Sequence, residues 1–475
     1  MNNVSFPTFR NRSIITKADS YKASHYLQYP KKTEKVFSYI ESRGGMYSET
    51  LFFGLQGFIK QYLLTPVTME DIEFAEYFWT NHIPGLKFNR PGWEYIVKKY
   101  QGKLPVEIKA VKEGRKVTAR NVVVSIENTD PKAFWLTSFL ETILLRGVWP
   151  ATTGATRSYE IKKVCRNFLE LTSDITNDNV KLNWMLHDFG MRGGKAEEAT
   201  AIAGAGHLIN FFGTDTTDAI FWANDYYNSG ICGYSIPASE HSTATMYGRN
   251  GEVEYLNMMI DTFGKPGAIF ANVADSYDVF GFVNKSLPQV KQKLIDSGAT
   301  MVVRPDSGDP VDTPLKVLQS LADVFDYTVN SKGYKVLNTV RLIQGDGVNE
   351  ESIRLILEGA RARGFSAENF AFGCGGYLLD AYNRDTQKWA MKCSYAQIEG
   401  EYIDVYKEPI TDPGKTSKRG KLELVSKNNE FKTVREVELS SRVSQGWTSE
   451  LEVVYRNGEL LREQSFEEIR KLANN

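Results

Sequence analysis

The sequence predicts an α/β protein with a central irregular α/β barrel and a β-rich α+β domain built from both chain ends. Between residues 151 and 390, short apolar strands alternate with polar loops and helices, which is typical of a parallel sheet or an α/β barrel. Residues 104–126 and those past 390 instead alternate apolar with polar side chains, as antiparallel strands do. The 475 residues also exceed what one compact core holds. We therefore expect an outer domain of residues 1–150 and 391–475 and a catalytic barrel domain of residues 151–390.

The predicted outer domain carries local signals for single elements. Thr68 stands three residues before Asp71, a capping-box-like pattern that predicts the start of an amphipathic helix. The stretch "RNGE" (456–459) contains Asn-Gly, the strongest short signal for a β-hairpin. Ser465 and Glu468 form a second capping box, which predicts a final helix.

The clearest unit of the predicted barrel is "SLPQVKQKLIDSGATMVVRPDSGDP" (286–310). Ser286 can cap a helix and Gly298 can end it, after which "TMVV" is expected to form a short buried strand. That strand leads directly to Arg304 and Asp306. In a barrel, the loops after the strands share one face, where active sites are built. We therefore expect the polar loops of this domain to converge on one site.

The composition disfavours several classes of partner. The 57 Lys and Arg residues are balanced by 58 Asp and Glu, which argues against a basic coat for nucleic acid. The four cysteines form no CxxC pair, so reduced thiols are expected rather than disulfides or a zinc site. No run of 18 apolar residues and no apolar leader occurs. The expectation is a cytoplasmic protein with neither nucleic acid nor a membrane as partner.

Four loops after predicted strands carry groups that bind phosphate, ribose or metal. They are "LHDFGMRGGKAEEAT" (186–200), "RPDSGDP" (304–310), "QGDG" (344–347) and "GCGG" (373–376). One glycine-rich turn is more often only backbone geometry. Four at matching places favour a phosphorylated ligand, and the Asp residues beside them suit Mg²⁺. No GxxxxGK[ST] and no strand-linked GxGxxG occurs, so neither a P-loop nor a Rossmann site is predicted.

Three features stay open on this reasoning. The basic run "DPGKTSKRGK" (412–421) is either a solvated loop or an arm that reaches phosphate. Asp215 either caps a helix or faces a ligand. His241, within "SIPASEHSTATMYG" (235–248), is either a surface loop residue or a catalytic one.

Taken together, these residues resemble the nicotinamide phosphoribosyltransferase family. The motifs that carry the resemblance run along nearly the whole chain: "ADSYKASHYLQYP", "HDFGMRG", "GTDT", "GYSIPASEHST", "DSYD", "RPDSGDP", "NSKGY", "IQGDGV", "FGCGG", "KCSY", "DPGKTSKRGK" and "SFEEIRK". The resemblance implies a type II phosphoribosyltransferase fold and a homodimer with shared active sites. It also implies a step of NAD salvage, in which nicotinamide and phosphoribosyl pyrophosphate give nicotinamide mononucleotide and pyrophosphate.

The resemblance further implies roles for single residues. Phe189 and Tyr21 would enclose the pyridine ring, the tyrosine coming from the partner subunit, and Asp215 would accept a hydrogen bond from the carboxamide. His241 would be phosphorylated when ATP hydrolysis is coupled to transfer, with Glu240 orienting its imidazole. The remaining residues implied at the substrates are Arg192, Ser235, Arg304, Asp306, Gly345, Asp346, Gly375, Gly376, Arg384, Lys392 and Lys415. Asp306 and Asp275 are the candidate ligands of Mg²⁺.

The implied chemistry agrees with these residue types. Displacing pyrophosphate from ribose C1 builds negative charge on the leaving group, so the site needs cations and N–H donors more than a strong nucleophile. A carboxylate at Asp215 accepts the amide N–H of nicotinamide and repels the carboxylate of nicotinate.

The chain departs from the family pattern at two places. The family's "GSGGG" stands here as "GCGGY", and its Cys374 and Tyr377 predict altered packing behind the phosphate. A serine that helps to hold the amide in the family is Ala271 here, which predicts weaker affinity for nicotinamide.

Two alternative functions are compatible with the same fold. A nicotinate phosphoribosyltransferase would be expected to place a cation, rather than Asp215, near the ring substituent. A non-catalytic binding protein on the same fold should have lost some of His241, Asp306 and Arg304, yet all three are present.

Overall fold

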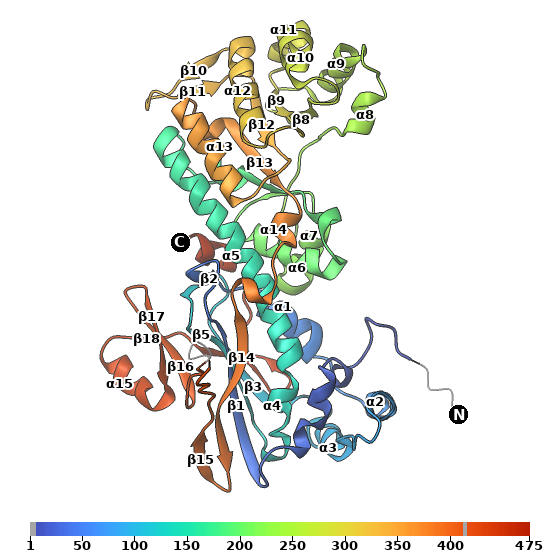
Figure 1. Cartoon of the computed structure of the whole chain (residues 1–475), viewed down its shortest axis with the longest axis vertical. Helices are drawn as coiled ribbons and strands as arrows, with labels where there is room; N and C mark the ends of the chain where they lie inside the picture. The colour runs from blue at the N-terminus through green and yellow to red at the C-terminus, as the bar shows by residue number, and fades with distance from the viewer. Residues whose placement is uncertain (1–5, 412–415) are drawn as a thin grey trace. The chain divides into compact units, whose positions relative to one another are not determined.

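The computed structural model describes residues 6–411 and 416–475, which form two compact units (Figure 1). The first unit takes the residues up to 156, residues 225–228 and the residues from 383 onward. The second unit takes residues 157–224 and 229–382. The long helix α5 (Glu141–Thr172) contributes residues to both. Within the described residues, no helix is long and apolar enough to cross a membrane.

The first unit is built on a seven-stranded antiparallel sheet to which both chain ends contribute. Its strands are, in spatial order, β15 (Glu401–Asp404), β14 (Trp389–Ile398), β1 (Thr33–Ser42), β5 (Val122–Asn128), β3 (Val106–Ala110), β19 (Glu452–Arg456) and β20 (Glu459–Leu460). β1 pairs with β14 from Thr33 opposite Ile398 to Ser42 opposite Trp389. The predicted hairpin is confirmed, because Asn457 and Gly458 both have positive φ between β19 and β20.

The remaining elements of this unit are two smaller sheets and several helices. They are β2 (Glu49–Leu51) with β4 (Lys116–Thr118), β16 (Leu422–Lys427) with β17 (Glu430–Arg435) and β18 (Thr448–Ser449), and helices α1 (Leu55–Phe58), α2 (Met69–His82), α3 (Arg90–Tyr100), α4 (Leu136–Phe139), α15 (Leu439–Ser444) and α16 (Phe466–Asn474). The capping boxes predicted at Thr68 and Ser465 start α2 and α16 as expected.

The second unit holds a six-stranded parallel sheet, which confirms the predicted α/β architecture. In spatial order its strands are β7 (Gly213–Thr214), β6 (Leu186–Asp188), β13 (Phe370–Cys374), β12 (Val340–Gln344), β9 (Thr300–Arg304) and β8 (Ile269–Val273). The hairpin β10 (Tyr327–Val329) and β11 (Lys335–Leu337) lies outside this sheet. Its helices are α6 (Glu197–Leu208), α7 (Thr217–Tyr227), α8 (His241–Thr245), α9 (Glu252–Phe263), α10 (Val279–Gly281), α11 (Leu287–Ser297), α12 (Asp312–Phe325), α13 (Glu350–Ala362) and α14 (Gly376–Leu379).

A short segment links the two edges of the parallel sheet; residues 234–239 are called the closing segment. At one end, Tyr234 forms a parallel bridge with Gly213 of β7, and Thr214 N donates to Tyr234 O at 2.9 Å. At the other end, Ala238 bridges Ala271 of β8, and Ala271 N donates to Pro237 O at 2.9 Å. Both edges are thereby bonded to the same segment, and the barrel is irregular at this point.

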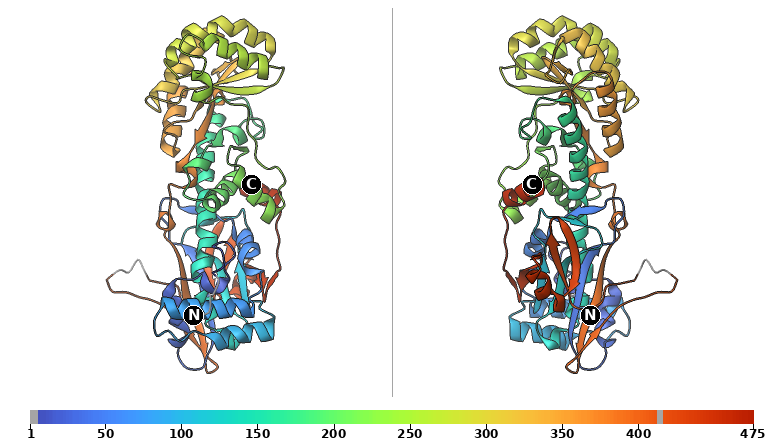
Figure 2. Two further views of the ribbon diagram at one scale, coloured as in Figure 1. Left: turned by 90° about the vertical axis from the view of Figure 1, so that its right-hand side faces the viewer. Right: turned by 90° about the vertical axis from the view of Figure 1, so that its left-hand side faces the viewer.

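The strands alternate between two apolar environments. On β9, Met301 and Val303 belong to the large core that includes the helices, while Val302 faces the barrel interior with Ala271 and Ile343. Figure 2 shows, from two further sides, the helices of residues 250–330 covering the strands of this unit. Gly298 ends α11 with φ of 67°, as predicted.

The predicted cap at Ser286 is wrong. A π-turn (Phe282–Ser286) leads directly into α11, so Ser286 already has helical φ and ψ of −82° and −49°. Its hydroxyl donates to Glu252 Oε2 on α9 and accepts no hydrogen bond from a backbone N–H of the first turn of α11.

Candidate functional site

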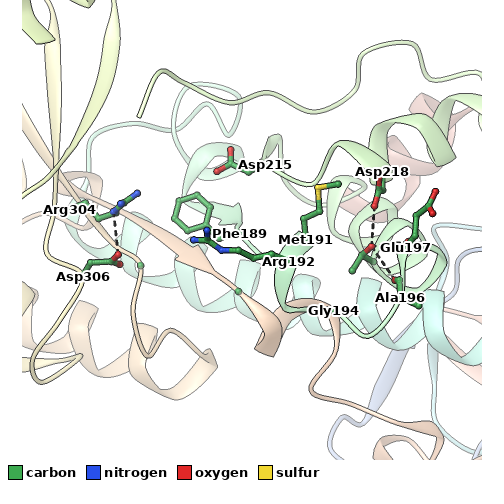
Figure 3. Close-up of a pocket in the computed structure, with 13 residues that line it drawn as sticks. Phe189, Met191, Arg192, Gly194, Ala196, Glu197, Asp215, Asp218, Arg304 and Asp306 are labelled. Atoms are coloured by element: carbon green, nitrogen blue, oxygen red, sulfur yellow. Dashed lines mark hydrogen bonds and ion pairs between the residues drawn. The ribbon is translucent and has the colours of Figure 1, made fainter. Parts of the chain in front are cut away.

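A pocket of about 750 Å³ lies where the parallel strands of the second unit end (Figure 3). It is lined by Phe189, Met191, Arg192, Gly194, Ala196, Glu197, Thr200, Asp215, Asp218, Arg304, Asp306, Gly345 and Gly375. Seven of these residues are predicted by name from the sequence, and they come from five different strand-end loops. This is the location at which α/β folds build binding sites.

Phe189 offers a flat apolar surface within the pocket. It follows β6, and its backbone N–H donates to Cys374 O at 2.9 Å, which ties the loop to β13. The ring packs on Gly373, where an added Cβ would lie 2.0 Å from Phe189 Cε2. It also contacts the small interior cluster that includes Ala271. A planar aromatic ligand suits such a surface, because ring faces stack favourably.

Asp215 follows β7 and carries an ionised carboxylate at the pocket. Its Oδ1 accepts hydrogen bonds from Ser235 Oγ and from His187 Nε2, the latter at 3.2 Å. Partial burial acts to raise the pKa of Asp215, but the bonds from His187 and Ser235 outweigh it and hold the pKa below its usual value. The carboxylate is therefore negative at neutral pH.

Asp188 stabilises the turn that presents Phe189. Its fully buried carboxylate accepts from Gly190 N at 2.8 Å and from Thr214 Oγ1 at 3.3 Å. Burial raises the pKa of Asp188 to about 6. This residue lies in "HDFG" but was not singled out from the sequence.

Arg304 and Asp306 stand at the end of β9. Arg304 Nε lies 3.8 Å from Asp306 Oδ2, and Arg304 Nη2 donates to Ser239 O of the closing segment at 3.1 Å. Gly345 is adjacent, since an added Cβ there would come 3.0 Å from Asp306 Oδ1. Figure 3 shows Arg192 beside the Phe189 ring and the Arg304–Asp306 pair to the other side of it. The pocket thus combines two guanidinium groups with an aromatic face, as an anionic ligand with a flat ring requires.

The glycine-rich loops approach one another closely. An added Cβ at Gly193 would lie 3.4 Å from Gly376, and Gly375 lines the pocket directly. Behind them, the Cys374 thiol is buried and lies 3.3 Å from Val348 O, and burial raises its pKa to about 12. Cys374 is therefore a packing residue beneath the loop. Asp346, also predicted at the site, is exposed in the neighbouring loop after β12.

His241 begins α8, just past the closing segment. Its Nε2 lies 3.0 Å from Asp275 Oδ1, and the Asp275 side chain is only 6% exposed, against 46% for His241. Asp275, predicted as a metal ligand, is thus the group that orients this imidazole. Glu240, which was expected to orient it, instead accepts from Ser242 Oγ within its own turn.

Comparison with known proteins decides the family. One family model, for the nicotinate phosphoribosyltransferase (NAPRTase) family, matches residues 184–442, and another, for the nicotinamide phosphoribosyltransferase N-terminal domain, matches residues 13–108. A nicotinamide phosphoribosyltransferase of Xanthomonas campestris is 47% identical over 465 residues, which cover 97% of this chain and 98% of the relative. The chain belongs to the nicotinamide phosphoribosyltransferase family. A relative of the same name from Acinetobacter baylyi is 33% identical over 96% of each chain.

As a member of the nicotinamide phosphoribosyltransferase family, the chain is an enzyme of the pentosyltransferase class. Two crystal structures resemble it in fold. Nicotinate-nucleotide pyrophosphorylase from Pyrococcus furiosus matches with a TM-score of 0.64 and 16% identity, over 100% of this chain and 97% of that one. Human nicotinic acid phosphoribosyltransferase matches with a TM-score of 0.54 and 16% identity, over 96% and 92%. These likenesses support the predicted type II phosphoribosyltransferase fold.

Two further predicted residues of this phosphoribosyltransferase, Arg384 and Lys392, lie in the first unit, where they line a cavity of about 560 Å³. Burial is the main cause that lowers the pKa of Lys392, and nearby cations lower it further. The cavity is rich in cations, which are Arg43, Arg120, Arg384, Lys388, Lys392 and Lys407, against the carboxylates of Glu141 and Asp385. Sequence reasoning missed Arg43 and Lys407. Arg43 directly follows β1 and precedes Gly44 and Gly45, a local signal that could have found it, whereas Lys407 has no glycine beside it.

Tyr21 is among the predicted residues that line neither cavity. Tyr21 lies in the first unit, where its side chain is 60% exposed and meets His25 edge-on at 4.8 Å between ring centroids. Lys415 lies outside the described residues.

A methyl group at Gly373 is expected to disturb the Phe189 surface. Because the added Cβ would lie 2.0 Å from the ring, Gly373→Ala should lower the free energy of unfolding by about 1–3 kcal/mol through overpacking. Urea unfolding followed by circular dichroism measures this. Gly193→Ala is the matched control, because its nearest neighbour is Gly376 at 3.4 Å, and it should stay within about 0.5 kcal/mol of wild type. Equal stability of both variants would contradict the packing described for Phe189.

Proposed function

We propose that the chain transfers the phosphoribosyl group of phosphoribosyl pyrophosphate to nicotinamide, giving nicotinamide mononucleotide and pyrophosphate in NAD salvage. The observation that carries this proposal is the Asp215 carboxylate beside the Phe189 face. A pyridine ring stacked on Phe189 places its substituent within reach of Asp215, and an amide N–H is the group that a carboxylate accepts. The names of the relatives from Xanthomonas and Acinetobacter support the same reaction.

The choice of base follows from charge. Nicotinate carries a carboxylate where nicotinamide carries an amide, and the negative charge held on Asp215 would repel it. Arg192 and Arg304 line the same pocket, and we assign them to the phosphates rather than to the ring substituent. Ala271 contributes only packing beside Phe189. Its side chain lies in the apolar interior cluster and can form no hydrogen bond to the amide.

In the proposed reaction, the pyridine nitrogen forms a bond to ribose C1 while the bond from C1 to the pyrophosphate oxygen breaks. Arg304 and Arg192 stabilise the negative charge that develops on pyrophosphate, and the N–H groups around Gly375 and Gly376 can donate to its oxygens. The described residues contain no cluster of three or more His, Cys, Asp or Glu side chains that could hold a metal by themselves. Mg²⁺ fits the site through Asp306 together with substrate oxygens, where it would neutralise phosphate charge.

We assign the coupling of ATP hydrolysis to His241. Asp275 holds Nε2 and leaves Nδ1 as the nitrogen that can take a phosphoryl group. Arg304 links this region to the pocket, because it contacts Ser239, two residues before His241. Phosphorylation of His241 would add negative charge close to the cations that hold the substrate phosphates.

The proposal includes a homodimer with shared active sites. The exposed ring of Tyr21 is available to a second copy, in which it would cover the free face of a pyridine ring stacked on Phe189. The basic cavity around Lys392 suits phosphate groups for the same electrostatic reason as the pocket of the second unit.

One assay tests the proposed function. The purified chain is incubated with Mg²⁺ and phosphoribosyl pyrophosphate and with either nicotinamide or nicotinate, each with and without ATP, and the mononucleotide product is quantified. Product from nicotinamide far above that from nicotinate, and more of it with ATP, is the expected result. Preferential use of nicotinate would replace the proposal by the nicotinate phosphoribosyltransferase alternative. No product from either base would favour a non-catalytic binding protein.

A further inference from the structure

Among the residues that the structure describes, the side-chain donors to Asp215 reach one of its two carboxylate oxygens. Both hydrogen-bond donors, Ser235 Oγ and His187 Nε2, reach Oδ1. They come from opposite sides of the residue, since His187 lies on β6 and Ser235 lies in the closing segment. A carboxylate anchored through one oxygen has a fixed rotation and presents its second oxygen in a defined direction.

The His187 ring is itself held in place by its surroundings. It meets the Phe189 ring at 5.3 Å between centroids with a tilt of 53°. On its other side lies Gly213, where an added Cβ would come 2.5 Å from His187 Nδ1. The side chain is only 13% exposed, whereas that of Asp215 is 50% exposed. The histidine is therefore the rigid member of the pair, and the carboxylate is the one that a ligand can reach.

We infer that His187 is a positioning residue for base selection: it fixes Asp215 through Oδ1 so that Oδ2 meets the carboxamide of the base. This inference rests on the proposed function and deepens it. His187 acts through Asp215 and forms no bond to the reacting atoms. Donation from Nε2 requires that this nitrogen carry a proton, so the neutral ring must be the Nε2–H tautomer.

The first test is His187→Phe, which keeps an aromatic ring between Phe189 and Gly213 and removes the donor. The ratio of kcat/KM for nicotinamide to that for nicotinate should fall by about tenfold, because one hydrogen bond to a charged acceptor is lost. The change should lie in KM for nicotinamide, while KM for phosphoribosyl pyrophosphate stays at the wild-type value. A purely structural role for the ring would shift both KM values together. His187→Gln retains an N–H donor and should recover part of the ratio.

An unchanged ratio in a folded His187→Phe variant overturns the inference. A second measurement does not depend on any variant folding. With histidine labelled by ¹⁵N in the wild-type chain, which has only five histidines, the imidazole shifts report the tautomer of His187. The Nε2–H form is expected, and a neutral Nδ1–H form would overturn the inference equally. Failure of the wild-type chain to use nicotinamide at all would instead mark failure of the proposed function, so the two are distinguishable.

Discussion

Replacement of His241 by alanine should abolish coupled ATP hydrolysis and leave phosphoribosyl transfer in the absence of ATP. The substitution removes the only group in its turn with a ring nitrogen that can accept a phosphoryl group, while Arg304, Asp306 and Phe189 stay in place. Steady-state ATP hydrolysis and acid-labile phosphate bound to the protein measure the first effect. Mononucleotide formation without ATP measures the second.

Two companion variants sharpen this experiment. His82→Ala removes an exposed histidine of the first unit that bonds Ser20, and it should hydrolyse ATP like wild type. Asp275→Asn removes the charge beside His241 Nε2 and should slow phosphorylation without abolishing it. If the His241→Ala protein hydrolyses ATP at the wild-type rate, the phosphohistidine assignment is wrong.

Replacement of Asp215 by asparagine should lower the preference for nicotinamide over nicotinate by about 10- to 100-fold. The shape of the side chain is nearly unchanged, and its carbonyl oxygen can still accept from Ser235. The charge that repels nicotinate is lost, and the new NH₂ group can donate to the nicotinate carboxylate. The two values of kcat/KM, measured with phosphoribosyl pyrophosphate at saturation, give the ratio.

Asp218→Asn is the matched control for this change. Asp218 also lines the pocket, but it lies beside Thr200 Oγ1 at 3.4 Å on the α6 side, away from Phe189 in Figure 3. Its substitution should alter the ratio of the two bases much less. A ratio for Asp215→Asn equal to that of wild type would remove Asp215 from base selection.

The fold could be predicted from sequence where the signal is local. The boxes at Thr68 and Ser465, the turn at Asn457 and the left-handed Gly298 each depend on neighbours within a few residues, and the structure confirms them. The prediction that Ser286 caps α11 is wrong because its contacts are not local. Its hydroxyl bonds Glu252, 34 residues away, and the helical path already begins before it, which no local pattern reports.

The residues of the candidate site also fall into those that local sequence predicts and those that only the folded structure reveals. Phe189, Arg192, Asp215, Arg304 and Asp306 stand directly after predicted strands, so the convergence of parallel strand ends was enough to expect them in one pocket, where the structure has them. Their roles in catalysis stay predictions. His187 and Asp188 were missed because their side chains act on other residues of the site, and such pairs become visible only when β6 lies beside β7.

If His241 is phosphorylated and Asp215 selects the base as proposed, the closing segment connects the two events. Ser235, which holds Asp215, and His241, which begins α8, are separated by only a few residues of a chain that is bonded to both edges of the sheet. A change of charge at His241 that shifts this segment toward β8 would displace Ser235 and so alter its hydrogen bond to Asp215. Phosphorylation of His241 would then change the affinity for the base at Asp215 while the strands themselves stay in place.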